Sequence, residues 1–220
     1  MTFRRSIVTA AAAFLGACAP IVRPVVTSVP APDEDEAAAD VPAESPAPFG
    51  MLTPGDPATD ADLGWLRETG LMVPVRGVSA AKLTDSFNAG RSGGRAHEAL
   101  DIPAPRGAPV VAATDGTVLR VGTNKLGGNV VWMADSGRRF AYYYAHMDHS
   151  AKGLKAGDIL TRGTVIGYVG TTGNAPRNVP HLHFQVLRMG NQTQWWNGTP
   201  VNPLGFIVDA PVAAPSRQPR

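Results

Sequence analysis

The placement of the histidines is the clearest chemical feature of this sequence. All five lie between residues 97 and 183, in three short runs: His97–Asp101, His146–His149 and His181–His183. Imidazole and carboxylate groups are zinc ligands, and imidazole also exchanges protons near neutral pH. The single cysteine, Cys18, excludes an intrachain disulfide and a cysteine-rich zinc site. Any metal in this chain is therefore expected on histidine and carboxylate ligands.

The run at His181 predicts a β-strand with two imidazoles on one face. Side chains alternate between the two faces of a strand, so His181, His183 and Gln185 are expected to point the same way. The apolar residues between them, Leu182 and Phe184, then point to the core. Two imidazoles are thus expected on one polar face.

A second strand, predicted over residues 139–146, adds a third imidazole. The same alternation places Tyr142, Tyr144 and His146 on one face of it. The two tyrosines, and Trp195 near the end of the domain, are predicted to stack against a bound substrate. Edge packing within a small β-domain is the alternative interpretation for Trp195.

The run that begins at His97 could be read as a helix with two ligands on one face, but the residues after it argue for an extended chain. Ile102 and Ala104 each precede a proline, and a residue before proline is pushed out of the α region. In an extended segment His97 and Asp101 share a face and Glu98 points away. Glu98 is therefore not predicted to be a general base.

Short apolar runs separated by turn signals predict the fold class. The 20 prolines and 24 glycines disfavour a helical bundle. We expect an all-β fold: a small antiparallel β-sheet or sandwich domain with a metal cleft, preceded by a disordered tether. The predicted strands are 109–113, 117–121, 129–134, 139–146, 165–169 and 181–187.

Together, three elements resemble a known family: His97-x-x-x-Asp101, Tyr144-x-His146 and His181-Leu182-His183-Phe184. They are similar to the lysostaphin-type zinc metallopeptidases of bacterial cell walls, and the similarity extends from about Val73 to Phe206. The resemblance implies one Zn²⁺ per domain, bound by His97, Asp101 and His183, with His146 and His181 as catalytic histidines. It also implies hydrolysis of peptide cross-links in peptidoglycan, expected between D-Ala and diaminopimelate.

The residue types support these roles on chemical grounds. Three histidine and carboxylate ligands with an open fourth position are typical of catalytic zinc, which lowers the pKa of a bound water to ~7 and polarises a carbonyl. His146 and His181 suit proton transfer, and the sequence leaves open which one is the base. The loop 87–96 departs from the family pattern, and it contributes Asn88 as a candidate substrate contact.

The N-terminus has the layout of a secretory signal: Arg4 and Arg5, an apolar stretch, and a short sequence ending at Cys18. Residues 15–18 resemble the lipobox of bacterial lipoproteins, which implies cleavage after residue 17 and lipidation of Cys18. An ordinary signal peptide with an incidental cysteine is the alternative. Ala19 after the cysteine implies an outer-membrane anchor that faces the periplasm.

The remaining segments divide the chain by composition. Residues 18–50 are rich in proline, alanine and acidic residues, and they are predicted to be a disordered tether. Residues 51–72 form a connecting segment with a short helix at 60–69, capped by Asp60. Residues 73–207 form the peptidase domain, and residues 208–220 a flexible tail.

The charge distribution limits the classes of binding partner that fit this chain. Residues 51–220 carry a net charge of +5, which fits an anionic cell-wall polymer but is too dilute for nucleic acid. Two other classes of function remain open: a non-catalytic regulator that activates a peptidoglycan amidase, and a periplasmic zinc store or adhesin. A non-catalytic regulator would have no need for a complete ligand set with two further histidines.

Overall fold

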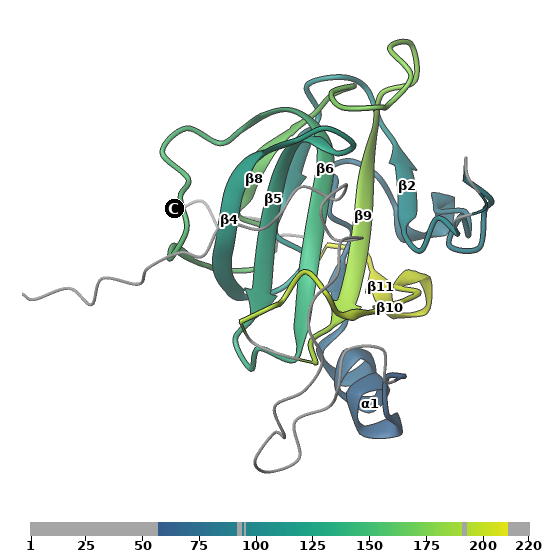
Figure 1. Cartoon of the computed structure of the whole chain (residues 1–220), viewed down its shortest axis with the longest axis vertical. Helices are drawn as coiled ribbons and strands as arrows, with labels where there is room; N and C mark the ends of the chain where they lie inside the picture. Colours follow the sequence, from purple (N-terminus) through teal and green to yellow (C-terminus); the bar gives the residue numbers. More distant parts are fainter. Residues whose placement is uncertain (1–56, 92–93, 95, 191–192, 211–220) are drawn as a thin grey trace, which may run out of the picture.

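The computed structural model describes residues 57–91, 94, 96–190 and 193–210 (Figure 1). The predicted leader, Cys18 and the tether lie outside these residues, as does most of the predicted tail. Among the described residues, no helix is both long enough and apolar enough to cross a bilayer.

A nine-stranded antiparallel sheet forms the body of the domain, and this confirms the predicted all-β antiparallel fold. Six strands follow one another in the order β10-β9-β6-β5-β4-β7, while β2 pairs with β9 and β8 pairs with β6 and β3 (Figure 1). The strands are β2 (Leu100–Pro103), β3 (Pro109–Val111), β4 (Gly116–Asn124), β5 (Gly128–Asp135), β6 (Phe140–Ser150), β7 (Ile159–Leu160), β8 (Val165–Val169), β9 (His181–Arg188) and β10 (Thr199–Val201).

The two faces of this sheet have different roles. On one face, Leu182 and Phe184 of β9 pack into the main hydrophobic core. On the other face, a smaller apolar cluster forms around Trp132, Tyr143 and Trp195. His183 and Gln185 alternate with the core residues of β9 and lie on this second face, as the sequence predicts.

The predicted orientation of Tyr142 and Tyr144 is wrong. Both side chains are fully buried in the main core, where the Ala113 N–H donates to Tyr144 Oη at 3.0 Å. The cause is a β-bulge in β6: Tyr144 pairs with Val131 and Met147 with Asn129, so two residues of β6 oppose one of β5. The extra residue breaks the period of two, and His146, at φ 61°, points to the face that also bears Tyr143.

A helix before the sheet, α1 (Asp60–Thr69), has the predicted bounds but not the predicted cap. Thr59, rather than Asp60, is the N-cap, and Thr59 and Asp62 form a capping box because their side chains bond each other's backbone N–H groups. Leu66 is buried in the main core. The following strand, β1 (Leu71–Met72), pairs in parallel with β11 (Ile207–Val208), so both ends of the described chain pack on the domain. The elements within the described residues also include the short 3₁₀ helices η1 (Ala80–Lys82) and η3 (Leu204–Phe206).

Candidate active site

A cleft of about 980 Å³ opens on the second face of the sheet. Strand pairing explains why ligating side chains meet there: in β9, His183 pairs with Asp101 of β2 on one side and with Ala145 of β6 on the other. No residue of α1 or β1 lines the cleft. The cleft is lined by all five residues predicted to bind metal or to act in catalysis: His97, Asp101, His146, His181 and His183.

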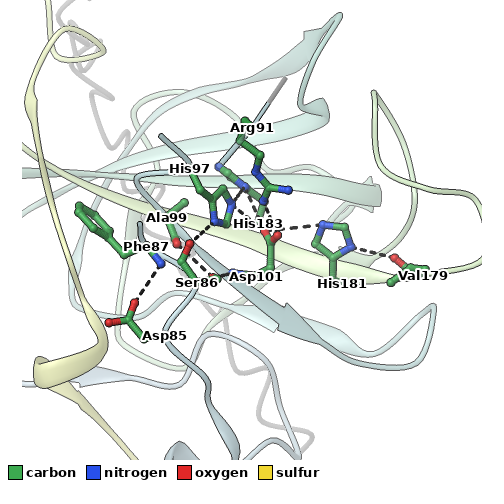
Figure 2. A network of polar contacts seen from close by, with 10 residues as sticks. All are labelled: Asp85, Ser86, Phe87, Arg91, His97, Ala99, Asp101, Val179, His181 and His183. Carbon is green, nitrogen blue, oxygen red and sulfur yellow. Dashed lines mark hydrogen bonds and ion pairs between the residues drawn. The ribbon is translucent and has the colours of Figure 1, made fainter. Parts of the chain in front are cut away.

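Three of these side chains converge on one point (Figure 2). His97 Nε2 lies 3.0 Å from Asp101 Oδ1 and 3.0 Å from His183 Nδ1, and the last two atoms are 3.2 Å apart. Ligand atoms about 2.0–2.1 Å from a tetrahedral zinc ion are about 3.3 Å from one another. The triangle of donor atoms therefore has the size that a zinc ion requires.

The protonation of His97 supports the same conclusion. His97 Nδ1 lies 2.8 Å from the carbonyl oxygen of Ser86, which can only accept, so this nitrogen carries the proton. In a neutral ring Nε2 then has a lone pair, and it faces the carboxylate of Asp101. Two acceptors aimed at each other suit a bound cation, and a backbone carbonyl that fixes the outer nitrogen is the usual support of a metal-ligating histidine.

Electrostatics hold Asp101 in the ionised form that a metal needs. Burial alone would raise the pKa of this carboxyl, but its polar neighbours His183, His97 and Arg91 outweigh burial and hold the pKa well below its usual range. Arg91 Nη2 contacts Oδ2 at 2.5 Å, which leaves Oδ1 for the ligand triangle (Figure 2). Burial also lowers the pKa of His183, so its ring is neutral and able to bind metal.

The other two histidines stand beside the triangle. His181 Nδ1 lies 2.8 Å from the Val179 carbonyl oxygen and His146 Nδ1 lies 2.9 Å from that of Thr172, so each ring presents an unprotonated Nε2 when it is neutral. Their ring centroids are 5.0 Å apart, and His181 Nε2 is 3.7 Å from Asp101 Oδ1. Both rings are therefore oriented to accept a proton next to the metal position.

The surroundings of His146 keep its ring neutral and fix its orientation. Burial, with the neighbouring His183, lowers the pKa of His146 to about 4, so the ring is neutral at physiological pH and can act as a base. The loops 124–128 and 170–174 cross behind it: Gly127 O accepts from His146 N, and Thr172 Oγ1 donates to Met147 O. This crossing fixes the carbonyl that orients the imidazole.

The profile of the sequence family described as Peptidase family M23 matches residues 95–203. The chain belongs to this family. Its peptidases are zinc metallo-endopeptidases, which accords with a triangle of two histidines and one aspartate. The predicted resemblance is thereby confirmed.

Individual relatives are similar to part of this chain. Over 139 residues the chain is 34% identical to the L-Ala--D-Glu endopeptidase of Bacillus subtilis. The match covers 61% of this chain and 41% of the relative. Over 117 residues it is 36% identical to the DD-carboxypeptidase/endopeptidase Mpg of Neisseria meningitidis. That match covers 53% of this chain and 24% of the relative. The solved catalytic domain of lysostaphin from Staphylococcus simulans is 25% identical with a TM-score of 0.47, over 65% of this chain and 95% of that one. The chain thus spans less than half the length of these curated relatives.

The residues predicted to contact substrate do not line the cleft of the M23 domain. Tyr142 and Tyr144 lie in the core, as described above, and Asn88 is exposed outside the cleft. Trp195 is buried against Trp132, with ring centroids 5.0 Å apart. Trp195 belongs to the smaller apolar cluster, as the alternative interpretation has it, whereas the next residue, Trp196, lines the cleft. The residues found in their place are Arg91, Arg120, Trp132, Tyr143, Gln185 and Trp196.

A glycine substitution at the loop crossing should disable catalysis while leaving the metal site in place. In Gly128→Ala the new Cβ would lie 2.2 Å from Thr172 Oγ1 and 2.3 Å from Gly173 N, at a φ of +66°. We expect the loops to separate and kcat to fall by at least about tenfold, which corresponds to a loss of about 1.4 kcal/mol of transition-state stabilisation. Zinc content should stay at the wild-type level.

Gly153→Ala is the matched control, since Gly153 also has a positive φ, +81°, but a Cβ there meets nothing within 4 Å. Both variants carry the backbone strain, and only Gly128→Ala adds the collision. Equal kcat in the two variants would contradict the role of the loop crossing.

Proposed function

We propose that the M23 domain is a zinc endopeptidase that hydrolyses peptide cross-links in peptidoglycan, at the bond between D-Ala and diaminopimelate. The observation that supports it is one cleft that holds three converging ligand atoms and two further imidazoles whose Nδ1 atoms are held by backbone carbonyls. Family membership points the same way, as do relatives named as endopeptidases, one of them as a peptidoglycan DD-endopeptidase.

His97, Asp101 and His183 would hold the zinc ion, which supplies a Lewis acid for the scissile carbonyl and lowers the pKa of a bound water. The protein supplies the proton transfers. His181 and His146 flank the metal position, and either Nε2 can take the proton of the attacking water and later return it to the leaving amine. The other imidazole, once protonated, can donate a hydrogen bond to the oxyanion that develops on the substrate carbonyl.

The location of the protein forms a second part of the proposal. We infer that Cys18 carries a lipid anchor in the outer membrane and that residues 18–50 tether the domain on the periplasmic side. The support is the leader-like layout of residues 1–17 and the proline-rich, acidic composition that follows. Residues 19–50, thirty-two residues of extended chain, reach at most ~100 Å, which would bring an anchored domain to a nearby cell-wall layer.

The decisive experiment is a muropeptide profile of Gram-negative sacculi after incubation with the purified full chain. We expect cross-linked dimers to be converted to monomers with intact stems, and neither a chelated sample nor His183→Ala to do so. Unchanged sacculi together with bound zinc would contradict the proposal and would favour the alternative, a regulator that activates a peptidoglycan amidase.

A further inference from the structure

A row of four side chains crosses the floor of the cleft beyond the metal position. Gln185 of β9 pairs with Tyr143 of β6, Tyr143 with Trp132 of β5, and Trp132 with Arg120 of β4. These strands are neighbours in the sheet (Figure 1), and all four side chains line the cleft. The row is therefore a single cross-strand feature, although its members are spread over 66 positions of the chain, from 120 to 185.

The row lies within reach of a peptide bound at the metal. Gln185 follows His183 by two residues on the same face, which places it ~6.7 Å further along β9. Neighbouring strands are ~4.8 Å apart, so Arg120 stands ~14 Å across the sheet from Gln185. An extended peptide covers that distance in about four residues.

The middle of the row is apolar and rigid, and its ends are polar. The rings of Trp132 and Tyr143 lie 4.3 Å apart and are almost fully buried, and Asn124 Nδ2 donates to the Tyr143 hydroxyl at 3.0 Å. Gln185 at one end and Arg120 at the other are only partly buried. The floor thus holds an amide and a guanidinium on either side of a buried aromatic pair.

The cleft has one cationic end and one apolar end. Arg91, the other arginine that lines it, is ion-paired with Asp101. On the far side of the metal position lies Val179, which is 49% exposed, together with Pro103 and Pro176. A ligand that spans the cleft therefore meets an apolar wall near His181 and a guanidinium beyond Gln185.

We propose that Arg120 is a specificity-determining residue that binds a carboxylate of the peptide substrate, with Gln185 as a second hydrogen-bonding group. The inference rests on the proposed function, since a diaminopimelate stem carries free carboxylates. A guanidinium binds a carboxylate through two parallel N–H···O bonds, and these bonds are stronger over an apolar floor than in water. The occupant of this end of the cleft is thus an acidic peptide.

The test compares two synthetic cross-linked peptides that differ in one group, a stem carboxylate about three residues from the scissile bond that is either free or amidated. The full-length wild-type protein should hydrolyse the free acid with a kcat/KM about 10- to 100-fold higher than the amide, the range expected of one charge-assisted hydrogen-bond pair. In Arg120→Gln this preference should disappear. Arg106→Gln is the matched control, because Arg106 is exposed, pairs with Asp148 and does not line the cleft.

Binding of an uncleaved stem peptide, measured by calorimetry on the same proteins, separates this inference from the proposed function. A wild-type protein that cleaves neither peptide contradicts the proposed function, while tighter binding of the free acid that Arg120→Gln abolishes still supports the role of Arg120. The inference is overturned if the wild type shows no preference in cleavage or binding. It is also overturned if Arg120→Gln keeps that preference, or if it weakens binding of peptide-free glycan strands instead.

Discussion

His183→Ala is expected to lose zinc and at least about 10³-fold in hydrolysis of cross-linked muropeptides. His183 Nδ1 is one corner of the ligand triangle, 3.0 Å from His97 Nε2 and 3.2 Å from Asp101 Oδ1. Two ligands do not hold a catalytic zinc ion, and the ion is worth several kcal/mol of transition-state stabilisation. Each ~1.4 kcal/mol is a factor of ten in rate. Elemental analysis of the purified protein and chromatography of the digested sacculi measure the two losses.

The chain offers a matched control in His149→Ala. His149 lies in the same strand as His146, but its side chain is exposed and stacks on Tyr168 outside the cleft. This variant should keep both zinc and activity. If His183→Ala retained a full equivalent of zinc, the assignment of the triangle as the metal site would be wrong. Loss of fold as the cause is excluded if the two variants have the same far-ultraviolet circular dichroism.

Asp62→Asn is expected to lower the free energy of unfolding by about 3–5 kcal/mol, the cost of breaking a buried ion pair by removing one partner. Arg188, at the end of β9, is 1% exposed, and its Nε donates to Asp62 Oδ2 at 2.9 Å. The same oxygen accepts from the backbone N–H of Thr59, so the asparagine also weakens the capping box of α1. The change is nearly isosteric, and urea denaturation followed by circular dichroism measures it.

Asp60→Asn serves as the comparison, because Asp60 lies in the first turn of the same helix and is exposed. We expect a loss of about 1 kcal/mol or less there, from the helix dipole alone. Similar losses in the two variants would show that the buried pair with Arg188 does not stabilise the domain. A large difference implies that α1 is part of the folding unit and that removing residues 57–70 would destabilise the domain.

Local chemistry and periodicity were sufficient for much of this protein. The alternation at His181, His183 and Gln185 depends only on strand geometry, and the structure has these side chains on one face. The prolines after Ile102 and Ala104 act on their own neighbours, and β2 is extended as predicted. The prediction that Glu98 points away from His97 and Asp101 is wrong, because Glu98 has a φ of 56° and lines the cleft. The helix at Asp60–Thr69 follows from its own residues. Signals of this kind are read within a few positions of the chain.

Contacts between distant segments decided the rest. The bulge that turns His146 to the cleft and Tyr144 to the core depends on pairing with β5 and on the crossing of loops 124–128 and 170–174, which no local pattern in β6 records.

By itself the sequence determined which residue types could bind a metal and exchange protons, and that His146, His181 and His183 lie on strands, because those properties depend on side-chain chemistry and local backbone geometry. Only the tertiary structure decided the register that pairs Asp101 with His183, the burial of Asp62 against Arg188, and the row that ends at Arg120. Each of these depends on segments far apart in the chain, and their relative positions result from the packing of the whole sheet.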